Sequence, residues 1–168
     1  AADAFIGCKA LQSFTLSPNH PYFFLADDAL CRTADSTLLL YPNAREPRTY
    51  RIPDGITAIS AYAFYDCDLL ESVVIPDSIT QIPERAFYGC SALTSVSLPD
   101  SLTEIGIAAF SFCAALTDIR LPASITEISA GLFSGCSSLA TLEIPDSVTI
   151  IGGDAFVGCT SLTSMDIP

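Results

Sequence analysis

A strict period of 23 residues constrains the fold of this chain more than any other feature of its sequence. Phenylalanine, cysteine and proline each recur at this spacing over most of the chain. The recurring residues are Phe64, Phe87, Phe110, Phe133 and Phe156; Cys67, Cys90, Cys113, Cys136 and Cys159; and Pro53, Pro76, Pro99, Pro122, Pro145 and Pro168. A fixed period between about 20 and 50 residues is typical of solenoids, so we predict a stack of coils.

Each copy contains a short strand with an inward and an outward side. Residues 93–99 alternate in polarity, so Val96 faces one way while Ser95 and Ser97 face the other. Pro99 ends the strand, because proline cannot donate a hydrogen bond to a ladder. The sequence therefore predicts one strand for each copy.

The rest of the copy returns the chain to the next strand. Asp100 and Ser101 follow a proline and suit a turn with local bonds from side chain to backbone. Residues 102–105 form a second extended piece, and residues 108–113 are compact enough for one short helical turn.

A single copy cannot fold alone, because it buries too little apolar surface to offset the entropy lost in ordering 23 residues. Stacking covers both flanks of each copy and joins its strand to a parallel sheet. In one copy the residues expected to face inward are Ile79, Ile82, Ala86, Phe87, Cys90, Leu93, Val96 and Leu98.

The period organises residues 1–168 as a single solenoid domain. Residues 1–19 form a partial repeat, and residues 20–51 form an enlarged repeat that breaks the period. Residues 52–166 are five regular repeats, and residues 167–168 start a further one.

The enlarged repeat contains a predicted β-hairpin. Residues 29–32 and 37–41 are β-prone, and residues 33–36 form a polar turn of hairpin length between them. Residues 42–44 end the second strand. We interpret this segment as a hairpin that elaborates one coil.

The repeat pattern I-P-x-S-[VI]-T-x-I-x-x-x-A-F-x-x-C-x-x-L-x-x-[VI]-x resembles the BspA-like, or Treponema-type, leucine-rich repeat family, directly over residues 1–19 and 52–168. The enlarged repeat is also similar to a recurring form in that family. The residues that carry this second likeness are Asn19, Pro21, Tyr22, Phe23, Asp28, Leu30, Leu38, Tyr41 and Pro42. The departures are Leu132 in place of the usual alanine, Cys31 inside the hairpin, and Gly55 in place of serine.

The resemblance implies an α/β leucine-rich-repeat solenoid with a parallel β-sheet on the concave face. It also implies short helical turns on the convex side and one β-hairpin insertion. Members of the family are typically secreted or cell-surface proteins associated with adhesion. The implied partner is therefore a protein, such as an extracellular matrix or host surface protein.

The net charge of −12, from 19 acidic and 7 basic residues, disfavours polyanionic partners. Nucleic-acid binding needs clustered lysine and arginine, and the only basic cluster is Arg45, Arg48 and Arg51. We expect no nucleic-acid partner and no binding to anionic membrane surfaces. No apolar run reaches the length of a transmembrane segment, and no signal peptide is visible at the N-terminus.

Catalysis is disfavoured because His20 is the only histidine, and it stands between Asn19 and Pro21 in a turn. A serine or cysteine nucleophile needs a positioned base. The aspartates that follow the recurring prolines repeat with the period, as turn residues would: Asp54, Asp77, Asp100 and Asp146. We predict that the protein is not an enzyme and has no catalytic residue and no cofactor.

The cysteines lack the close spacing of a structural zinc site. We expect a column of free, buried thiols that pack as small hydrophobic groups. Cys31 lies outside the period, so we expect it to be exposed and open to modification. Glu143 and Asp166 lie on neighbouring strands, but two carboxylates fall short of the oxygen ligands that calcium takes, so we predict no metal site.

The predicted binding site is the outward side of the sheet, because solenoids commonly bind ligands on that face. Its residues are Ser72, Ser95, Ser97, Asp118, Arg120, Thr141, Glu143, Ser164 and Asp166. A second predicted surface is aromatic and consists of Tyr62, Tyr65, Tyr88 and Phe112. The alternatives are that the polar residues are ordinary solvated strand positions and that the rings only pack on one another.

These observations favour a non-catalytic protein-binding or adhesion module with its ligand on the concave sheet face. The alternative is a structural scaffold subunit of a larger assembly, which an acidic surface and a serine-rich sheet face permit equally. The last copy keeps its full apolar set, so we expect further repeats or another chain at the C-terminal end.

Overall fold

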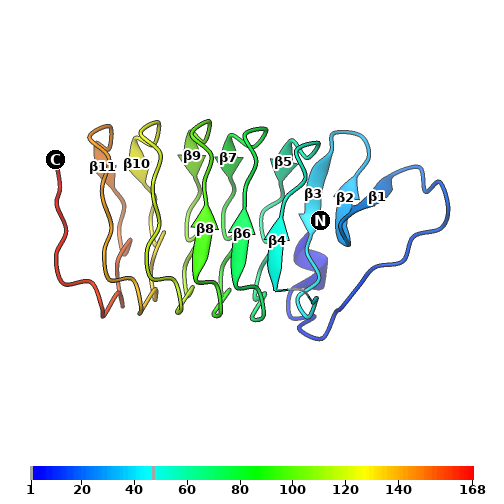
Figure 1. The fold of residues 1–168 in the computed structure, drawn as a ribbon, viewed down its shortest axis with the longest axis horizontal. Coiled ribbons are helices and arrows are strands. Elements are labelled where there is room, and N and C mark those ends of the chain that lie inside the picture. Colours follow the sequence, from blue (N-terminus) through cyan, green and yellow to red (C-terminus); the bar gives the residue numbers. More distant parts are fainter. Residues whose placement is uncertain (1, 47) are drawn as a thin grey trace.

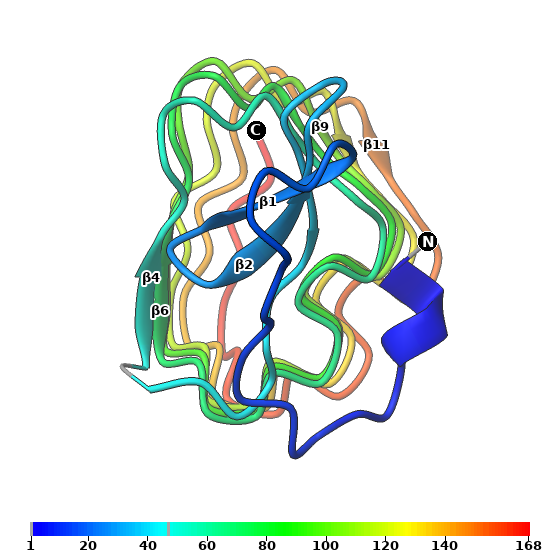
Figure 2. The same cartoon turned by 90° about the vertical axis from the view of Figure 1, so that its right-hand side faces the viewer.

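Successive copies of the repeat form successive coils of a solenoid (Figure 1). The computed structural model describes residues 2–46 and 48–168. The coils superimpose when the molecule is viewed along the stack (Figure 2), with the N-terminal hairpin at one end and the C-terminus at the other. The predicted solenoid is confirmed.

One side of each coil forms a parallel ladder through β4 (Thr49–Arg51), β6 (Ser72–Val74) and β8 (Ser95–Ser97). The register joins residues one period apart, so that Val73 pairs with Val96. Alternation along these three-residue strands buries the middle side chain and turns the two outer ones outward.

The same face continues beyond β8 through residues 118–120, 141–143 and 164–166, which follow at the same spacing. A parallel bridge between Glu143 and Asp166 shows that the register persists there. We call the outward side of β4, β6, β8 and these three segments the sheet face.

A second ladder runs along a different side of the coil (Figure 2). Its strands are β5 (Ala58–Ile59), β7 (Gln81–Ile82), β9 (Glu104–Ile105), β10 (Glu127–Ile128) and β11 (Ile150–Ile151). β7 pairs with β9 and β10 with β11, both in parallel. In β7, β9 and β10 the isoleucine is buried and its polar neighbour is exposed, so the two ladders enclose the core between them.

The predicted hairpin is confirmed as β2 (Ala29–Arg32) and β3 (Thr37–Leu40), which pair in antiparallel fashion. The sequence reasoning missed a third strand, β1 (Phe23–Ala26), which pairs with β2. Asp27 and Asp28 connect β1 to β2 with φ angles of 45° and 69°, the left-handed backbone of a two-residue hairpin turn. β3 then pairs in parallel with β5 and so joins the hairpin to the second ladder.

Hydrogen-bonding and charged groups attach this hairpin to the first regular coil. The Tyr50 hydroxyl donates to the carbonyl of Ala26 over 2.8 Å, and burial raises the pKa of Tyr50. Arg45 lies over the rings of Tyr41 and Tyr50, with 5.7 and 5.8 Å to the ring centroids, and pairs with Asp28 at 3.1 Å. These contacts hold the hairpin against the stack.

A column of phenylalanine rings fills the core. Phe64, Phe87, Phe110 and Phe133 are fully buried, and Phe156 is half-buried at the last coil. Successive centroids are 4.7, 5.3, 6.1 and 5.9 Å apart. The rings thus carry packing from each coil to the next.

The cysteines line this column as free thiols, as predicted. Each thiol from Cys90 onward donates to a phenylalanine carbonyl in the preceding coil; Cys90, for example, bonds to Phe64 over 3.0 Å. Burial raises the pKa of Cys136 to about 12. Cys8 in the partial repeat is instead exposed, and Cys159 is half-buried.

The prediction for Cys31 was wrong. Its side chain is fully buried on the inner side of β2, and burial raises its pKa to about 11. The hairpin packs this side against the coil, a tertiary contact that lies outside the repeat pattern.

Residues 108–113 form consecutive turns and not a regular helical turn. The amide of Ser111 donates to Ala108 over 3.1 Å, but Ala108 and Phe112 have φ angles of 53° and 60°. These left-handed residues bracket the turn and stop it from propagating as a helix. In the described residues the only helical element is the 3₁₀ helix η1 (Ala2–Phe5).

The turn serines bond between coils, contrary to the local bonds expected from sequence. Ser101 Oγ donates to the carbonyl of Asp77 over 2.9 Å, and Ser78 Oγ donates to that of Ile56 over 2.7 Å. The turn that follows each proline is present as predicted, with Ile79 N donating to Pro76 O over 3.0 Å. The serine column therefore links neighbouring coils through hydrogen bonds.

The last coil is less well covered than the central ones. The side chains of Ile150, Val157 and Ile167 are 53%, 58% and 60% exposed, and Phe156 and Met165 are half-buried. No helix in the described ranges is long and apolar enough to cross a membrane.

Candidate functional site

The structure brings all nine predicted residues together on the sheet face. They form two rows across the strands, because residues one period apart lie side by side. Eight are exposed, and Ser72 is half-buried. One row contains Ser72, Ser95, Asp118, Thr141 and Ser164, and the other contains Ser97, Arg120, Glu143 and Asp166 after Val74.

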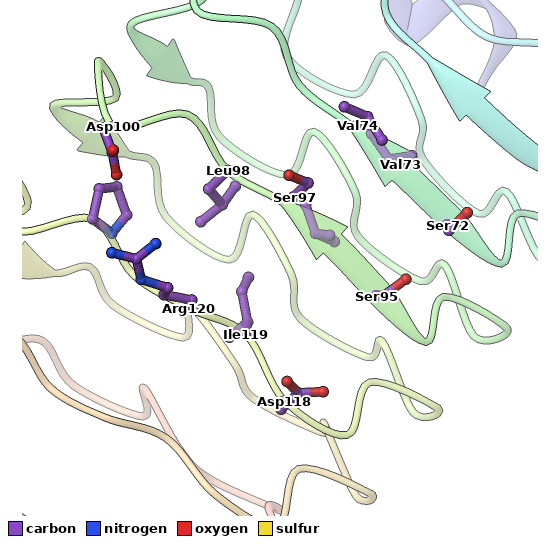
Figure 3. A pocket seen from close by; sticks show the side chains of 12 residues that line it. Ser72, Val73, Val74, Ser95, Ser97, Leu98, Asp100, Asp118, Ile119 and Arg120 are labelled. Atoms are coloured by element: carbon purple, nitrogen blue, oxygen red, sulfur yellow. The ribbon is translucent and has the colours of Figure 1, made fainter.

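A first depression of about 440 Å³ lies over β6, β8 and the segment that follows (Figure 3). Its lining includes Ser72, Ser95, Ser97, Asp118 and Arg120. Most of this lining is uncharged, with serine hydroxyls beside the half-buried side chains of Val74 and Leu98. Such a surface offers hydrogen bonds at a lower cost in desolvation than charged side chains would.

Two further depressions adjoin the first. One, of about 690 Å³, lies toward the C-terminal coils and is lined by Asp118, Arg120, Thr141, Glu143 and Asp146, among others. The other, of about 540 Å³, lies at the edge where the strands enter their turns, and its lining includes Arg51, Asp54, Asp77, Asp100 and Arg120. Arg120 is the one residue that all three depressions share.

Charge on the sheet face is divided along the stack. At the N-terminal end Arg48 is paired with Glu46 and Glu71, each at 3.1 Å, and Arg51 is paired with Asp54 at 3.0 Å. These exposed pairs leave the basic end largely neutralised.

At the C-terminal end Glu143 and Asp166 lie directly opposite each other in the ladder. Both side chains are exposed, and neither makes an ion pair with a described residue. Like charges placed opposite each other on neighbouring strands destabilise a sheet. This end of the sheet face therefore presents a concentrated negative charge.

The predicted aromatic residues also come together, in one row. The Tyr65 and Tyr88 rings stack with centroids 4.9 Å apart at 3°, Tyr62 lies 5.7 Å from Tyr65, and Phe112 lies edge-on 5.3 Å from Tyr88. Arg85 donates to the Tyr62 hydroxyl over 3.0 Å. The rings do pack on one another, yet Phe112 remains 51% exposed. None of the three depressions includes them.

His20 serves the turn before β1. Its Nδ1 accepts backbone amide hydrogen bonds from Tyr22 and Phe23 over 3.3 and 3.2 Å, and its ring stacks on Phe23 at 5.2 Å. No described group of three or more His, Cys, Asp or Glu side chains is arranged to hold a metal ion.

Sequence reasoning missed Asp100 and Asp77 as part of the site. It placed them only as turn residues, whereas the third depression includes both. The signal was available, because each follows a strand by a few residues and must therefore lie at the same edge of the sheet.

Comparison with known proteins places this geometry among bacterial leucine-rich repeat proteins. Residues 49–168 match the BspA type leucine rich repeat region, in six copies. No curated protein matches the chain.

Solved structures agree with that match. A leucine rich cell surface protein from Faecalibacterium prausnitzii is 34% identical with a TM-score of 0.91, over 97% of this chain and 43% of that protein. A leucine rich repeat protein from T. pallidum is 31% identical with a TM-score of 0.71, over 92% of this chain and 72% of that one. The pneumococcal vaccine antigen PcpA shares the fold. It is 16% identical with a TM-score of 0.67, over 94% of this chain and 50% of that one. The chain thus spans less than half the length of the F. prausnitzii protein.

Proposed function

This chain belongs to the BspA-type leucine-rich repeat family, and we propose that it is a non-catalytic protein-binding or adhesion module whose ligand lies on the sheet face. Solenoids of this kind generally serve as scaffolds for binding and not for catalysis. The proposed location is the cell surface or the extracellular space, in line with the description of the F. prausnitzii protein. The proposed partner is an extracellular matrix or host surface protein.

The proposal rests on one observation, which is that the first two depressions are continuous with each other. Together they follow the sheet face from β6 to residues 141–147, and both include Asp118 and Arg120. A continuous trough across several strands suits an extended or convex protein surface. Its short hydroxyl side chains let a partner approach the backbone closely. Its charged residues can fix the orientation of the partner through charge complementarity.

The experiment is a binding assay of the purified chain against immobilised extracellular matrix and host surface proteins. The test variant carries Ser95→Arg and Ser97→Arg, which fill the first depression. The control carries Thr80→Arg and Gln81→Arg, at exposed positions directly before and at the start of β7. We expect the test variant to lose binding and the control to keep it.

Two results would count against the proposal. One is the absence of any binding partner in the panel, and the other is equal loss in both variants. Elution of the native chain only within a stable large complex, without panel binding, would favour the scaffold alternative.

We propose the aromatic row as a secondary contact surface, supported by the exposure of Phe112 at a left-handed backbone position. The equivalent residues in the two neighbouring coils are Gly89 and Gly135, which adopt this conformation without strain. Phe112→Gly should weaken binding in the same assay while leaving the sheet face intact. Unchanged binding would confine the row to a packing role.

A further inference from the structure

Arg120 differs from every other basic side chain that the structure describes. The other six are each engaged in an ion pair, and Arg120 makes none with any described residue. Those six are Lys9, Arg32, Arg45, Arg48, Arg51 and Arg85. In a chain with a net charge of −12, an exposed arginine without a carboxylate partner is unexpected.

The repeat explains why Arg120 lacks the partner that Arg51 has. Arg51 occupies the same position three coils earlier, and its guanidinium forms an ion pair with Asp54, the residue three positions later. The residue three positions after Arg120 is Ala123, where other coils carry an aspartate such as Asp100 or Asp146. Arg120 therefore lies in a coil that lacks the turn aspartate, whereas Arg51 lies in a coil that has it.

The guanidinium is placed to meet a ligand. Arg120 is exposed, and it lies where the three depressions of the sheet face join. Figure 3 shows its side chain extending away from Asp118 and toward the turn end of the depression. On its N-terminal side the row continues through Ser97 and Val74, which carry no charge.

The charges on its C-terminal side give the site a polarity. Glu143 and Asp166 follow Arg120 in the same row and carry no counter-ion among the described residues. The midpoint of this carboxylate pair is one and a half strand spacings from the Arg120 strand, or about 7 Å. Residues i and i+2 of an extended peptide are also about 7 Å apart on one side.

We propose that Arg120 binds a carboxylate side chain of the partner protein, in a segment that presents a basic side chain to Glu143 and Asp166. This inference rests on the proposed function and specifies the chemistry of its partner. Charge complementarity selects the occupant: an acidic residue followed two positions later by a lysine or arginine, or the reverse order if the segment runs the other way. Arginine is suited to the contact because its planar fork grips a carboxylate with two hydrogen bonds.

The probe is the peptide acetyl-Gly-Glu-Ala-Lys-Gly-amide, titrated into the isotope-labelled chain and followed by NMR. The controls are the peptides with Gln in place of Glu and with Gln in place of Lys. We expect saturable shifts of the Arg120 Nε–Hε signal and of the Ser97 amide. Replacing Glu in the peptide should weaken binding by up to about 5-fold, the range for an exposed ion pair.

Three protein variants locate the contact. Arg120→Gln should weaken binding of the Glu peptide to the same extent. Ala123→Asp should do so too, because it gives Arg120 the same ion pair that Arg51 forms with Asp54. Arg32→Gln is the matched control, since it removes an exposed arginine that is already paired with the residue three positions later, Asp35, and that lies outside the three depressions; it should bind the probe like the parent chain. Ala123 is exposed, so its replacement leaves the core intact.

The proposal is overturned if the Glu and Gln peptides bind equally, if Ala123→Asp binds as well as the parent, or if the Arg120 signal does not move. Its failure is distinct from failure of the proposed function. A panel partner that is lost with Ser95→Arg and Ser97→Arg but kept with Arg120→Gln would preserve the sheet face as the binding site and reject the carboxylate anchor.

Discussion

Replacing Phe87 with alanine removes a ring that is stacked on both sides within the core. Phe87 is fully buried, and its centroid lies 4.7 Å from that of Phe64 and 5.3 Å from that of Phe110. A cavity between two coils cannot collapse without separating their ladders, so we expect the full cost of a buried Phe→Ala replacement, about 3–5 kcal/mol. With a urea dependence of about 2 kcal/mol per molar, the midpoint should fall by about 1.5–2.5 M.

The assay is urea unfolding followed by circular dichroism, with Phe156→Ala as the matched control. Phe156 has a single described stacking neighbour, Phe133 at 5.9 Å, and is only half-buried. Its replacement should lower the midpoint by roughly half as much, in proportion to the apolar area that it buries. Equal shifts for the two variants, or no shift for Phe87→Ala, would refute the view that the ring column transmits stability between coils.

Three further predictions follow from burial. Alkylation of the native chain at pH 8 should modify Cys8 and leave Cys31 unmodified; rapid labelling of Cys31 in mass spectrometry would contradict its burial. Burial raises the pKa of Cys31 from 9.0 in the unfolded chain to about 11, so the folded protein retains the thiol proton at a higher pH. The free energy of unfolding should therefore be unaffected below pH 9 and should fall as the pH rises toward 11, by up to about 1.4 kcal/mol per pH unit. Cys31→Ala should flatten that slope, and an unchanged slope would assign it to other groups. Amides near Met165 should exchange faster than those near Val96, because the last coil is only half-buried; equal protection would contradict this.

The path of the regular coils could be predicted from the sequence because each repeat imposes the same local solution. The alternation around Val96 and the proline that follows it were enough to place β8, and the period then placed its neighbours in register. The turns at residues 108–113 were misassigned because left-handed backbone at non-glycine residues leaves little trace in composition. Cys31 was misplaced because tertiary packing decides which side of a hairpin is buried.

The candidate site was predicted as a set of positions but not as a pattern of charge. Period and alternation select every outward residue of the sheet, including Arg120, yet they do not say which of these side chains are neutralised within the protein. That information comes from contacts such as the one between Arg51 and Asp54, which shows what the turn aspartate does for an arginine on the sheet face. At Ala123 the turn aspartate is absent, and the arginine of the same coil lacks the partner that Arg51 has. In a repeat protein, a departure from the consensus is therefore most informative when the structure shows which interaction the consensus residue supplies elsewhere in the stack.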